Sequence, residues 1–427
     1  MNLTLWKSTR SICNLLAAAA GLALVMASPL AAQQRAKPPC APDNGGFTLP
    51  KGFCAMVVAE SLGTVRHLVV APNGDIWAAR RGQDGGLVVL RDTTGDGKVD
   101  QVKRFYAAPG GGSGVALGKD ALYFAWDDRV VRFSWPAGNA QPDTLPTLVV
   151  RGLPVGGHSA KGLAIGKDGR LYVSIGSLTN SCQMRDRQNN SAGHQPCTEL
   201  EQRAGVWRFD PLKEGQAAHL AARVATGLRN PMAVSIEPTT GALYAGVHGR
   251  DGLTDQWGWP AEAGRENPAE VVFALPDGTD GGWPYCYYDP RGKQRLQNPE
   301  YGGDGTKVGD CDKRMALPAL AFPAHWAPNA TLFYSGSQFP AAYRNGLFVA
   351  FHGSWNRGTT PEAQEGFRVV FAPFRDGKAV GTYETFAAPA GAPNSIRPTG
   401  LAVGPDGSLY IGADREGKIW RVMYTGN

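Results

Sequence analysis

The stretch LPVGGHSAKGLAIGKDGRLYVSIGS, residues 153–177, reads as a strand, a turn and a second strand. Residues 162–166 and 170–176 are rich in β-branched and aromatic side chains, and the Lys-Asp-Gly between them favours a tight turn. His158 comes just before the first strand, on a glycine-lined approach, with Lys161 close behind it. Whether this histidine is a packed residue or a catalytic one depends on what the rest of the chain places beside it.

The same hairpin pattern recurs along the chain. Further copies occupy residues 65–80, 114–133, 230–249 and 397–414, with a degraded copy at residues 327–353. The spacing begins at about 45–50 residues and lengthens around residues 250–320, where the sequence suggests insertions. A four-stranded unit repeated at such a period is typical of a β-propeller. The sequence therefore predicts an all-β, six-bladed β-propeller with four-stranded antiparallel blades, and five or seven blades are the alternatives.

Polar residues hold comparable positions just before or at the first strand of several copies. They are Arg66, His158, Arg229 with Asn230, and Arg397. A propeller gathers the loops of all its blades around a central channel, so residues far apart in sequence can converge there. We therefore expect these side chains to point at one axial mouth.

The N-terminus has the features of a secretory signal peptide over residues 1–32. Lys7 and Arg10 precede a short apolar run, and small residues follow it before the polar segment that begins at Gln33. We expect an N-terminal extension at residues 33–53 and the propeller domain at residues 54–427. The expected location is periplasmic or secreted.

The charge and hydropathy of the chain exclude some partners. The net charge is +6, and loss of the two basic residues of the signal peptide lowers it to +4. No basic run is present, so we expect no nucleic-acid partner. Outside the signal segment no stretch offers 18 uninterrupted apolar residues, so we expect no membrane span.

Six of the seven cysteines remain once Cys13 leaves with the signal peptide. Six cysteines allow fifteen pairings, but here they form three local couples: Cys40 with Cys54, Cys182 with Cys197, and Cys286 with Cys311. An oxidising compartment permits disulfides, and closing a loop of about 15 residues contributes roughly 3 kcal/mol. We predict three structural disulfides.

Several motifs resemble those of the quinoprotein glucose/sorbosone dehydrogenases. They are GGHSAKGLAIGKDGRLYVSIGS, GLRNPMAVSIEPTTGALYAGVHGRD, NPAEVVFALPDGTDGGWPYCYYD, HWAPNATLFYSGSQFP, FHGSWNR and RPTGLAVGPDGSLYIGAD. The resemblance runs in order from about residue 54 to residue 424 and is nearest to the branch of pyranose and sorbosone dehydrogenases. It implies a dehydrogenase that uses pyrroloquinoline quinone (PQQ) and calcium.

The resemblance also implies roles for single residues. His158 matches the general base that takes a proton from a sugar hydroxyl while hydride passes to the quinone, and an imidazole titrates near neutrality. Gly157 replaces an acidic neighbour found in soluble glucose dehydrogenases of this family. Arg229 and Asn230 match a pair that contacts the quinone, where a guanidinium stabilises developing negative charge.

Further cofactor and metal residues follow from the same resemblance. Arg397 resembles an arginine that pairs with a cofactor carboxylate, and Arg66 and Arg357 are candidates by position and motif. For calcium, the resemblance suggests Gly249 and Arg250 as main-chain donors and Glu270 as a ligand of a second ion. His352, Trp355 and Trp326 either wall the sugar and the cofactor or belong to the core.

The leading hypothesis is a dehydrogenase that oxidises the anomeric or aldehyde carbon of a sugar and passes electrons to an external acceptor, a cytochrome or a quinone. Two other classes stay open: a calcium-dependent six-bladed lactonase or hydrolase, and a propeller that binds glycans or partners without catalysis. The arginine-rich mouth suits a tricarboxylate quinone better than a lactonase metal site. The sequence does not name the sugar, the acceptor or the oligomeric state.

Overall fold

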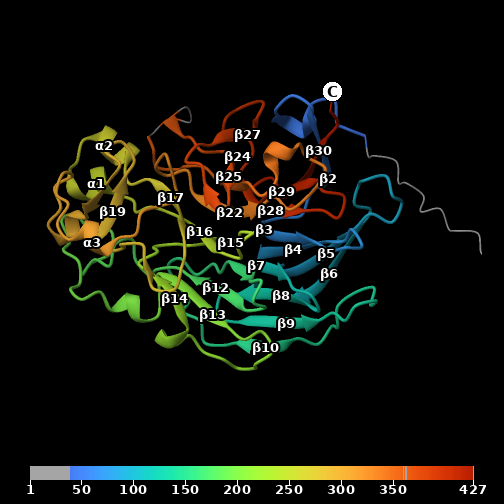
Figure 1. The fold of residues 1–427 in the computed structure, drawn as a ribbon, viewed down its shortest axis with the longest axis horizontal. Helices are drawn as coiled ribbons and strands as arrows, with labels where there is room; N and C mark the ends of the chain where they lie inside the picture. The colour runs from blue at the N-terminus through green and yellow to red at the C-terminus, as the bar shows by residue number, and fades with distance from the viewer. Residues whose placement is uncertain (1–38, 359, 361–362, 427) are drawn as a thin grey trace, which may run out of the picture. The chain divides into compact units, whose positions relative to one another are not determined.

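A computed structural model describes residues 39–426 of the chain, except residues 359 and 361–362 (Figure 1). The predicted signal peptide, residues 1–32, and the first part of the predicted extension lie outside the described residues. Within the described part, strands predominate and helices are few and short. The all-β class predicted from the repeat is therefore confirmed.

In the described part of the chain most strands divide into six antiparallel sets of four, of which the first two are joined in one eight-stranded sheet. The first three sets are β3 (Val65–Val70), β4 (Ile76–Gly82), β5 (Gly86–Arg91), β6 (Gln101–Ala107); β7 (Gly110–Leu117), β8 (Ala121–Trp126), β9 (Val130–Ser134), β10 (Thr147–Val150); and β11 (Leu163–Ile165), β12 (Leu171–Ile175), β13 (Gly205–Phe209), β14 (Arg223–Thr226). The last three are β15 (Ala233–Ile236), β16 (Leu243–Val247), β17 (Glu270–Ala274), β21 (Leu320–Phe322); β22 (Pro328–Phe333), β23 (Leu347–Phe351), β24 (Arg368–Ala372), β27 (Glu384–Pro389); and β28 (Pro398–Val403), β29 (Leu409–Ala413), β30 (Lys418–Tyr424), β2 (Phe53–Ala59).

The hairpin that opens each set follows from its turn chemistry. Between β11 and β12, Asp168 accepts a hydrogen bond from the Arg170 amide at 3.0 Å, and Gly169 has a φ of +74°, a value that glycine adopts without strain. Asp406 and Gly407 repeat this arrangement between β28 and β29. Such turns fix the register of the two strands and therefore fix which residues emerge at each end.

The first strands of the six sets contact one another in chain order, and β28 of the last set contacts β3 of the first. These strands together line a cavity of about 220 Å³. The last set includes β2 from near the N-terminus, which pairs with the C-terminal β30. Apolar cores lie between neighbouring sets: Trp77 of β4 and Phe124 of β8 belong to one, and Tyr123 of β8 and Trp207 of β13 to another.

The lengthened repeat around residues 250–320 corresponds to two insertions in the fourth set. The remaining elements are α1 (Leu253–Trp257), α2 (Ala261–Glu266), α3 (Cys311–Arg314), β1 (Phe47–Thr48), β18 (Thr279–Asp280), β19 (Cys286–Asp289), β20 (Gln294–Gln297), β25 (Phe374–Arg375), β26 (Lys378–Ala379) and the 3-10 turns Asn44–Gly46, Thr198–Glu201, Leu220–Ala222, Pro299–Tyr301 and Ala341–Tyr343. Figure 1 shows α1, α2, α3 and β19 gathered at the left of the view. The boundary expected at residue 54 falls one residue inside β2.

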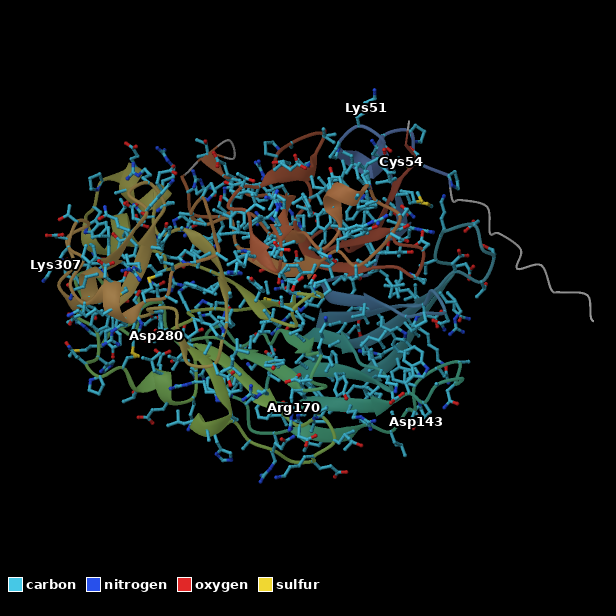
Figure 2. The ribbon with its side chains drawn as sticks, viewed as in Figure 1. Lys51, Cys54, Asp143, Arg170, Asp280 and Lys307 are labelled. Atoms are coloured by element: carbon cyan, nitrogen blue, oxygen red, sulfur yellow. A yellow bond between two sulfur atoms is a disulfide. The ribbon has the colours of Figure 1, made fainter. Side chains whose placement is uncertain are left out.

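Three disulfides join the predicted couples Cys40–Cys54, Cys182–Cys197 and Cys286–Cys311, so this prediction is confirmed. Cys54 is labelled in Figure 2, at the N-terminal side of β2. Over the described residues, no helix is long and apolar enough to cross a membrane.

Candidate active site

The predicted polar residues lie at the beginnings of first strands and meet at one end of the ring of first strands. Arg66 is the second residue of β3, and His158, Asn230 and Arg397 precede β11, β15 and β28. The Arg66 guanidinium lies 3.4 Å from the sulfur of Met232, two residues after Asn230. The Ser177 amide, beside His158, donates to the Arg229 carbonyl at 2.7 Å. These contacts place the Arg66 side chain next to the segment of Asn230 and the segment of His158 next to that of Arg229.

His158 is held through one side of its ring. Its Nδ1 lies 3.1 Å from the Ser177 carbonyl oxygen and 3.0 Å from Ser177 Oγ, and this hydroxyl donates to the Thr179 carbonyl at 2.7 Å. Both Ser177 oxygens are therefore acceptors, so the proton of the neutral ring resides on Nδ1. Burial, with Arg229 and His248 nearby, lowers the pKa of His158 to about 2. This pKa is well below the near-neutral value expected from the residue type, so the ring is neutral. Among the described residues no group binds Nε2, and its lone pair can accept a proton.

Lys161 anchors the approach to His158. Its side chain is buried, and its ammonium donates to the carbonyls of Pro154, at 3.0 Å, and Ser159. Burial lowers the pKa of Lys161 to about 8. Its role in the structure is to tie together the loop that carries His158.

The Arg229 guanidinium binds four oxygen atoms. Nε donates to the Asn180 carbonyl at 3.0 Å, and Nη1 donates to the Gly249 carbonyl at 2.6 Å. Nη2 donates to Asn180 Oδ1 at 3.0 Å and to Asp251 Oδ2 at 3.1 Å. The side chain is only 5% exposed, and burial lowers its pKa from the usual value. A fixed, buried cation of this kind is suited to stabilise negative charge beside His158.

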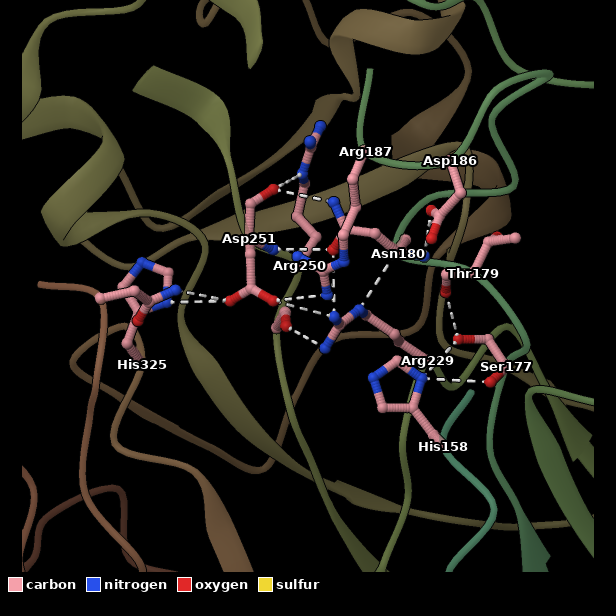
Figure 3. Close-up of polar contacts among 12 residues, drawn as sticks. His158, Ser177, Thr179, Asn180, Asp186, Arg187, Arg229, Arg250, Asp251 and His325 are labelled. Atoms are coloured by element: carbon pink, nitrogen blue, oxygen red, sulfur yellow. Dashed lines mark hydrogen bonds and ion pairs between the residues drawn. The ribbon is translucent and has the colours of Figure 1, made fainter. Parts of the chain in front are cut away.

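Asp251 is the centre of this polar network (Figure 3). Its Oδ2 accepts from both Arg229 and Arg187 at 3.1 Å, while Oδ1 accepts from Asn356 at 2.8 Å and lies 3.5 Å from His325 Nδ1. Burial alone would raise the pKa of Asp251, but Arg229 and His325 outweigh it and hold this pKa well below its usual value. In turn, Asp251 outweighs the burial of His325 and raises the pKa of that ring. Asp251 is therefore an anion that orients Arg229.

A second network lies around Asp414, directly after β29. Asp414 Oδ2 accepts from Arg66 at 2.7 Å and Oδ1 lies 2.9 Å from His352 Nε2. The Arg397 guanidinium lies 3.5 Å from His352 Nδ1 and 4.8 Å from the centre of the Phe367 ring. Arg397 therefore has no carboxylate within hydrogen-bond distance of its guanidinium among the described residues.

Asn230 and His248 lie between the two networks. The His248 amide donates to the Asn230 carbonyl at 3.2 Å, and His248 Nε2 lies 3.1 Å from the Pro328 carbonyl. Burial lowers the pKa of His248 to about 3. Asn230 is 8% exposed, and its Oδ1 is buried without a hydrogen-bond partner among the described residues. An unpartnered buried acceptor next to Arg229 in the chain is a place where a donor group of a ligand would be recognised.

The residues expected to hold calcium are engaged with protein groups. The Gly249 carbonyl accepts from Arg229, and the Glu270 carboxylate accepts from the Gly249 amide at 3.1 Å. Burial raises the pKa of Glu270 to about 7. The Arg250 side chain forms a buried ion pair with Glu300 at 2.7 Å. The described residues contain no group of three or more His, Cys, Asp or Glu side chains that could hold a metal ion.

Arg357, another expected cofactor residue, directs its guanidinium to protein groups. It donates to the carbonyls of Arg265 and Ala324 at 3.0 Å and to Glu266 at 3.0 Å. It thereby joins the loop after β23 to the end of α2. Two other residues of this loop reach the site: Asn356 through Asp251, and His352 through Asp414.

The TrAA12-like family profile matches residues 47–425 of the chain. The chain belongs to this family. One curated relative is a pyrroloquinoline quinone-dependent pyranose dehydrogenase of Coprinopsis cinerea, with 25% sequence identity. The alignment covers 89% of the present chain and 53% of the relative. The chain spans about half the length of the curated relatives it matches.

Solved structures share the fold. The holo form of the PQQ domain of the Coprinopsis cinerea pyranose dehydrogenase matches with a TM-score of 0.71 and 19% identity, over 88% of this chain and 97% of that one. The calcium structure of Trichoderma reesei Carbohydrate-Active Enzymes Family AA12 matches with a TM-score of 0.74 and 18% identity, over 92% and 99%. The resemblance to quinoprotein sugar dehydrogenases indicated by the sequence motifs is thus confirmed at the level of the family.

Several residues of the site in this TrAA12-like chain escaped the sequence reasoning. They are Ser177, Asn180, Asp251, His325 and Asp414. Three of them follow the second strand of a set: Ser177 after β12, Asp251 after β16 and Asp414 after β29. His325 lies three residues before β22, just outside the degraded copy at residues 327–353. Polar residues just after the second strand of each repeat were the signal that could have identified them.

Proposed function

We propose that the chain is a PQQ-dependent dehydrogenase that oxidises a pyranose or a sugar aldehyde. The observation that carries this proposal is the pairing of His158, whose Nε2 is free to accept a proton, with the buried cation of Arg229 in one polar site. Family membership and the relatives' names support the reaction class.

The charge of the site fits the quinone, which has three carboxyl groups. The side chains at the mouth comprise four guanidinium groups and two carboxylates, from Arg66, Arg187, Arg229, Arg397, Asp251 and Asp414. An excess of positive charge suits a polar tricarboxylate, and the unpartnered Asn230 Oδ1 can accept a hydrogen bond from an N–H or O–H group of a ligand. Arg66, Arg229, Asn230 and Arg397 would hold the quinone, whereas both terminal nitrogens of Arg357 already bind protein groups.

When bound, the quinone supplies the acceptor for the hydride that leaves the sugar carbon. The chain's own contribution is proton transfer and charge stabilisation. His158 Nε2 accepts the proton of the sugar hydroxyl, while Ser177 holds Nδ1–H and so keeps Nε2 directed at the substrate. Arg229, fixed by Asp251 and Asn180, stabilises the negative charge that develops at the acceptor oxygen.

Calcium belongs to the proposal as a companion ion, supported by the calcium-containing Trichoderma reesei structure. The arrangement of residues 249–251 does not itself present a calcium site, because the Gly249 carbonyl accepts from Arg229 and Glu270 accepts from the Gly249 amide. We therefore assign no step to calcium.

The architecture that we infer is the six-bladed β-propeller. The six antiparallel sets, the contacts among their first strands and the pairing of β2 with β30 support it. Three disulfides support a periplasmic or secreted location. Electrons then pass to an external acceptor, a cytochrome or a quinone.

Reconstitution tests the proposal. The mature protein, purified without cofactor, is mixed with PQQ with and without calcium, and quinone occupancy and its reduction by a panel of aldoses are measured. His158→Ala should keep the quinone and lose about 10²–10⁴-fold in the rate of reduction, because it lacks only the base. Arg229→Ala and Arg229→Lys should lower both occupancy and rate, because the guanidinium serves both.

The two rival functions give different results. A lactonase would bind no stoichiometric quinone and would hydrolyse lactones in a metal-dependent way. A non-catalytic binding protein would show neither quinone binding nor turnover. Reduction at the wild-type rate by quinone-loaded His158→Ala would show that His158 is not the base.

A further inference from the structure

A pocket of about 280 Å³ lies beside the loop that carries His158, outside the site described above. It is lined by Gly110 at the start of β7, by residues 126–129 at the turn between β8 and β9, and by Val155. Its volume is near the lower end of the range for small-molecule sites, about 300–1,000 Å³. Val155 lies three residues before His158, so their α-carbons are at most about 11 Å apart.

Asp127 in this pocket is fixed by its neighbours. Arg81 donates two hydrogen bonds to its carboxylate, at 2.9 and 2.7 Å, and Ser159 Oγ donates a third at 2.8 Å. A carboxylate has about four lone-pair positions, so one remains for a ligand. Because Ser159 follows His158 directly, this contact couples the pocket wall to the catalytic loop.

The pocket is balanced in charge. Asp127 pairs with Arg81, and Asp128 pairs with Arg129 through two hydrogen bonds of 2.7 Å. Asp128 keeps unused acceptor positions, and its side chain is 41% exposed. Neither an anion nor a cation is favoured by such a wall, whereas an uncharged ligand with many hydroxyl groups can donate to both carboxylates.

The pocket also offers apolar surface and close approach to the backbone. Trp126 is half-buried, with the Arg129 guanidinium 4.9 Å from the centre of one face of its ring, and Val155 is 53% exposed. The position of a Cβ on Gly110 has no atom within 4 Å, so the main chain there faces open space. Apolar area together with fixed hydroxyl acceptors is the combination that a sugar ring requires, since its C–H faces are apolar and its edges are polar.

We propose that this pocket is a second sugar subsite, which binds the unit next to the sugar that is oxidised at His158. This inference rests on the proposed function. It deepens that function by assigning the substrate class: the chain accepts neutral disaccharides or longer oligosaccharides, with the reacting unit at His158 and its neighbour against residues 126–129.

The test compares glucose with the disaccharides cellobiose and maltose on the quinone-loaded protein. Trp126→Ala should lower the ratio of kcat/KM for the better disaccharide to kcat/KM for glucose about tenfold, because only the disaccharide contacts this wall. Asp128→Asn keeps the side-chain volume and should lower the same ratio. The matched control is Trp135→Ala at the opposite end of β9, which should leave the ratio at its wild-type value.

The outcomes separate this proposal from the proposed function. An unchanged ratio in both Trp126→Ala and Asp128→Asn would overturn the subsite. If neither the wild type nor any variant oxidises a sugar, the proposed function fails. The subsite is then tested by saturation-transfer NMR of cellobiose with the quinone-free protein. A signal in the wild type and in Trp135→Ala that is lost in Trp126→Ala supports the subsite, and a signal retained in Trp126→Ala, or absent from the wild type, overturns it.

Discussion

The orientation of His158 depends on hydrogen bonds that its own sequence neighbourhood does not reveal. The ring is held by Ser177, nineteen positions later, and the His158 amide also donates to the Ser177 carbonyl at 2.9 Å. The sequence could indicate that the histidine occupies a shared mouth, because its place in the repeat is visible. It could not indicate which group orients the ring in place of the acidic neighbour that is missing at Gly157. That group is Ser177, which follows β12, the second strand of the hairpin.

Ser177→Ala should lower the rate of cofactor reduction about fivefold while quinone occupancy stays at the wild-type level. The variant removes one of two acceptors of the His158 Nδ1–H, and a single hydrogen bond contributes about 1 kcal/mol. The pH profile of the rate should change as well, because the ring loses part of the network that sets its tautomer. Stopped-flow reduction measures the effect, and the exposed Ser335→Ala is the control.

An unchanged rate and pH profile in Ser177→Ala would show that the Ser177 carbonyl alone positions the ring. Equal slowing in Ser335→Ala would indicate a general effect on the protein rather than on His158.

Arg229 and Arg250 show that residue type and burial do not determine which carboxylate an arginine binds. Both are buried arginines near the site, 5% and 1% exposed at their side chains. Arg229 shares Asp251 with the catalytic network, whereas Arg250 pairs with Glu300, fifty positions later, in the second insertion. The motif His-Gly-Arg-Asp identifies the residues, but it does not show that Glu300 of the second insertion contacts Arg250.

At the scale of the hairpin, each repeat presents a residue before its first strand and another after its second strand. The two positions are adjacent because the strands are antiparallel, as for His158 and Ser177. Between neighbouring sets they also meet, as for Arg66 of the first and Asp414 of the last. The repeat allowed the residues before each first strand to be predicted. Predicting the residues after each second strand needed the register of the hairpin and the order of the sets around the ring.

The insertions of the fourth set hold the segment that contains Asp251. Glu300 accepts from Arg250 at 2.7 Å and from Trp257 at 3.0 Å, and Gln183 donates to it at 3.1 Å. Arg250 and Trp257 come from the first insertion, and Gln183 comes from the third set. The sequence predicted the insertions from the lengthened spacing but not this contact, because insertions have no register imposed by the repeat.

Glu300→Gln should destabilise the protein by about 3–5 kcal/mol, because it leaves the buried Arg250 charge without its counter-ion. The matched control is Glu262→Gln, which breaks the exposed pair with Arg291 in the same insertion region, at 3.2 Å, and should cost at most about 1 kcal/mol. Urea unfolding of the cofactor-free proteins measures both. Similar losses in the two variants would contradict the role of the buried pair.

At the scale of the whole chain, most of the fold can be predicted from the repeat, because similar units with short hairpins can pack together in few ways. The closing set is the exception. Its fourth strand is β2, which precedes the first set in the sequence, so the predicted start of the domain at residue 54 cut this strand by one residue. The repeat cannot mark such a strand because it is separated from its set by the full length of the domain. Its pairing with β30 joins the two ends of the domain.

Half-buried histidines lie in and beside the ring of first strands, and these predict how the molecule responds to acid. Burial lowers the pKa values of His67, His248 and His158 to about 4, 3 and 2. The unfolded chain protonates these rings near pH 6.5. Below that pH the unfolded state binds protons that the folded state does not, so stability falls as the pH falls. His325, whose pKa is raised by Asp251, acts in the opposite direction.

His67 allows this account to be tested away from the catalytic residues. It faces the cavity of the first strands, and its Nε2 lies 2.7 Å from the Asn329 carbonyl. His67→Gln keeps a donor for this carbonyl and removes one titrating group. The loss of unfolding free energy between pH 6 and pH 4.5 should therefore be smaller in the variant by about 1.4 kcal/mol per pH unit. Urea unfolding at several pH values measures this slope, with the exposed His219→Gln as control. A slope in His67→Gln equal to that of the wild type would mean that His67 is protonated in the folded protein as readily as in the unfolded chain.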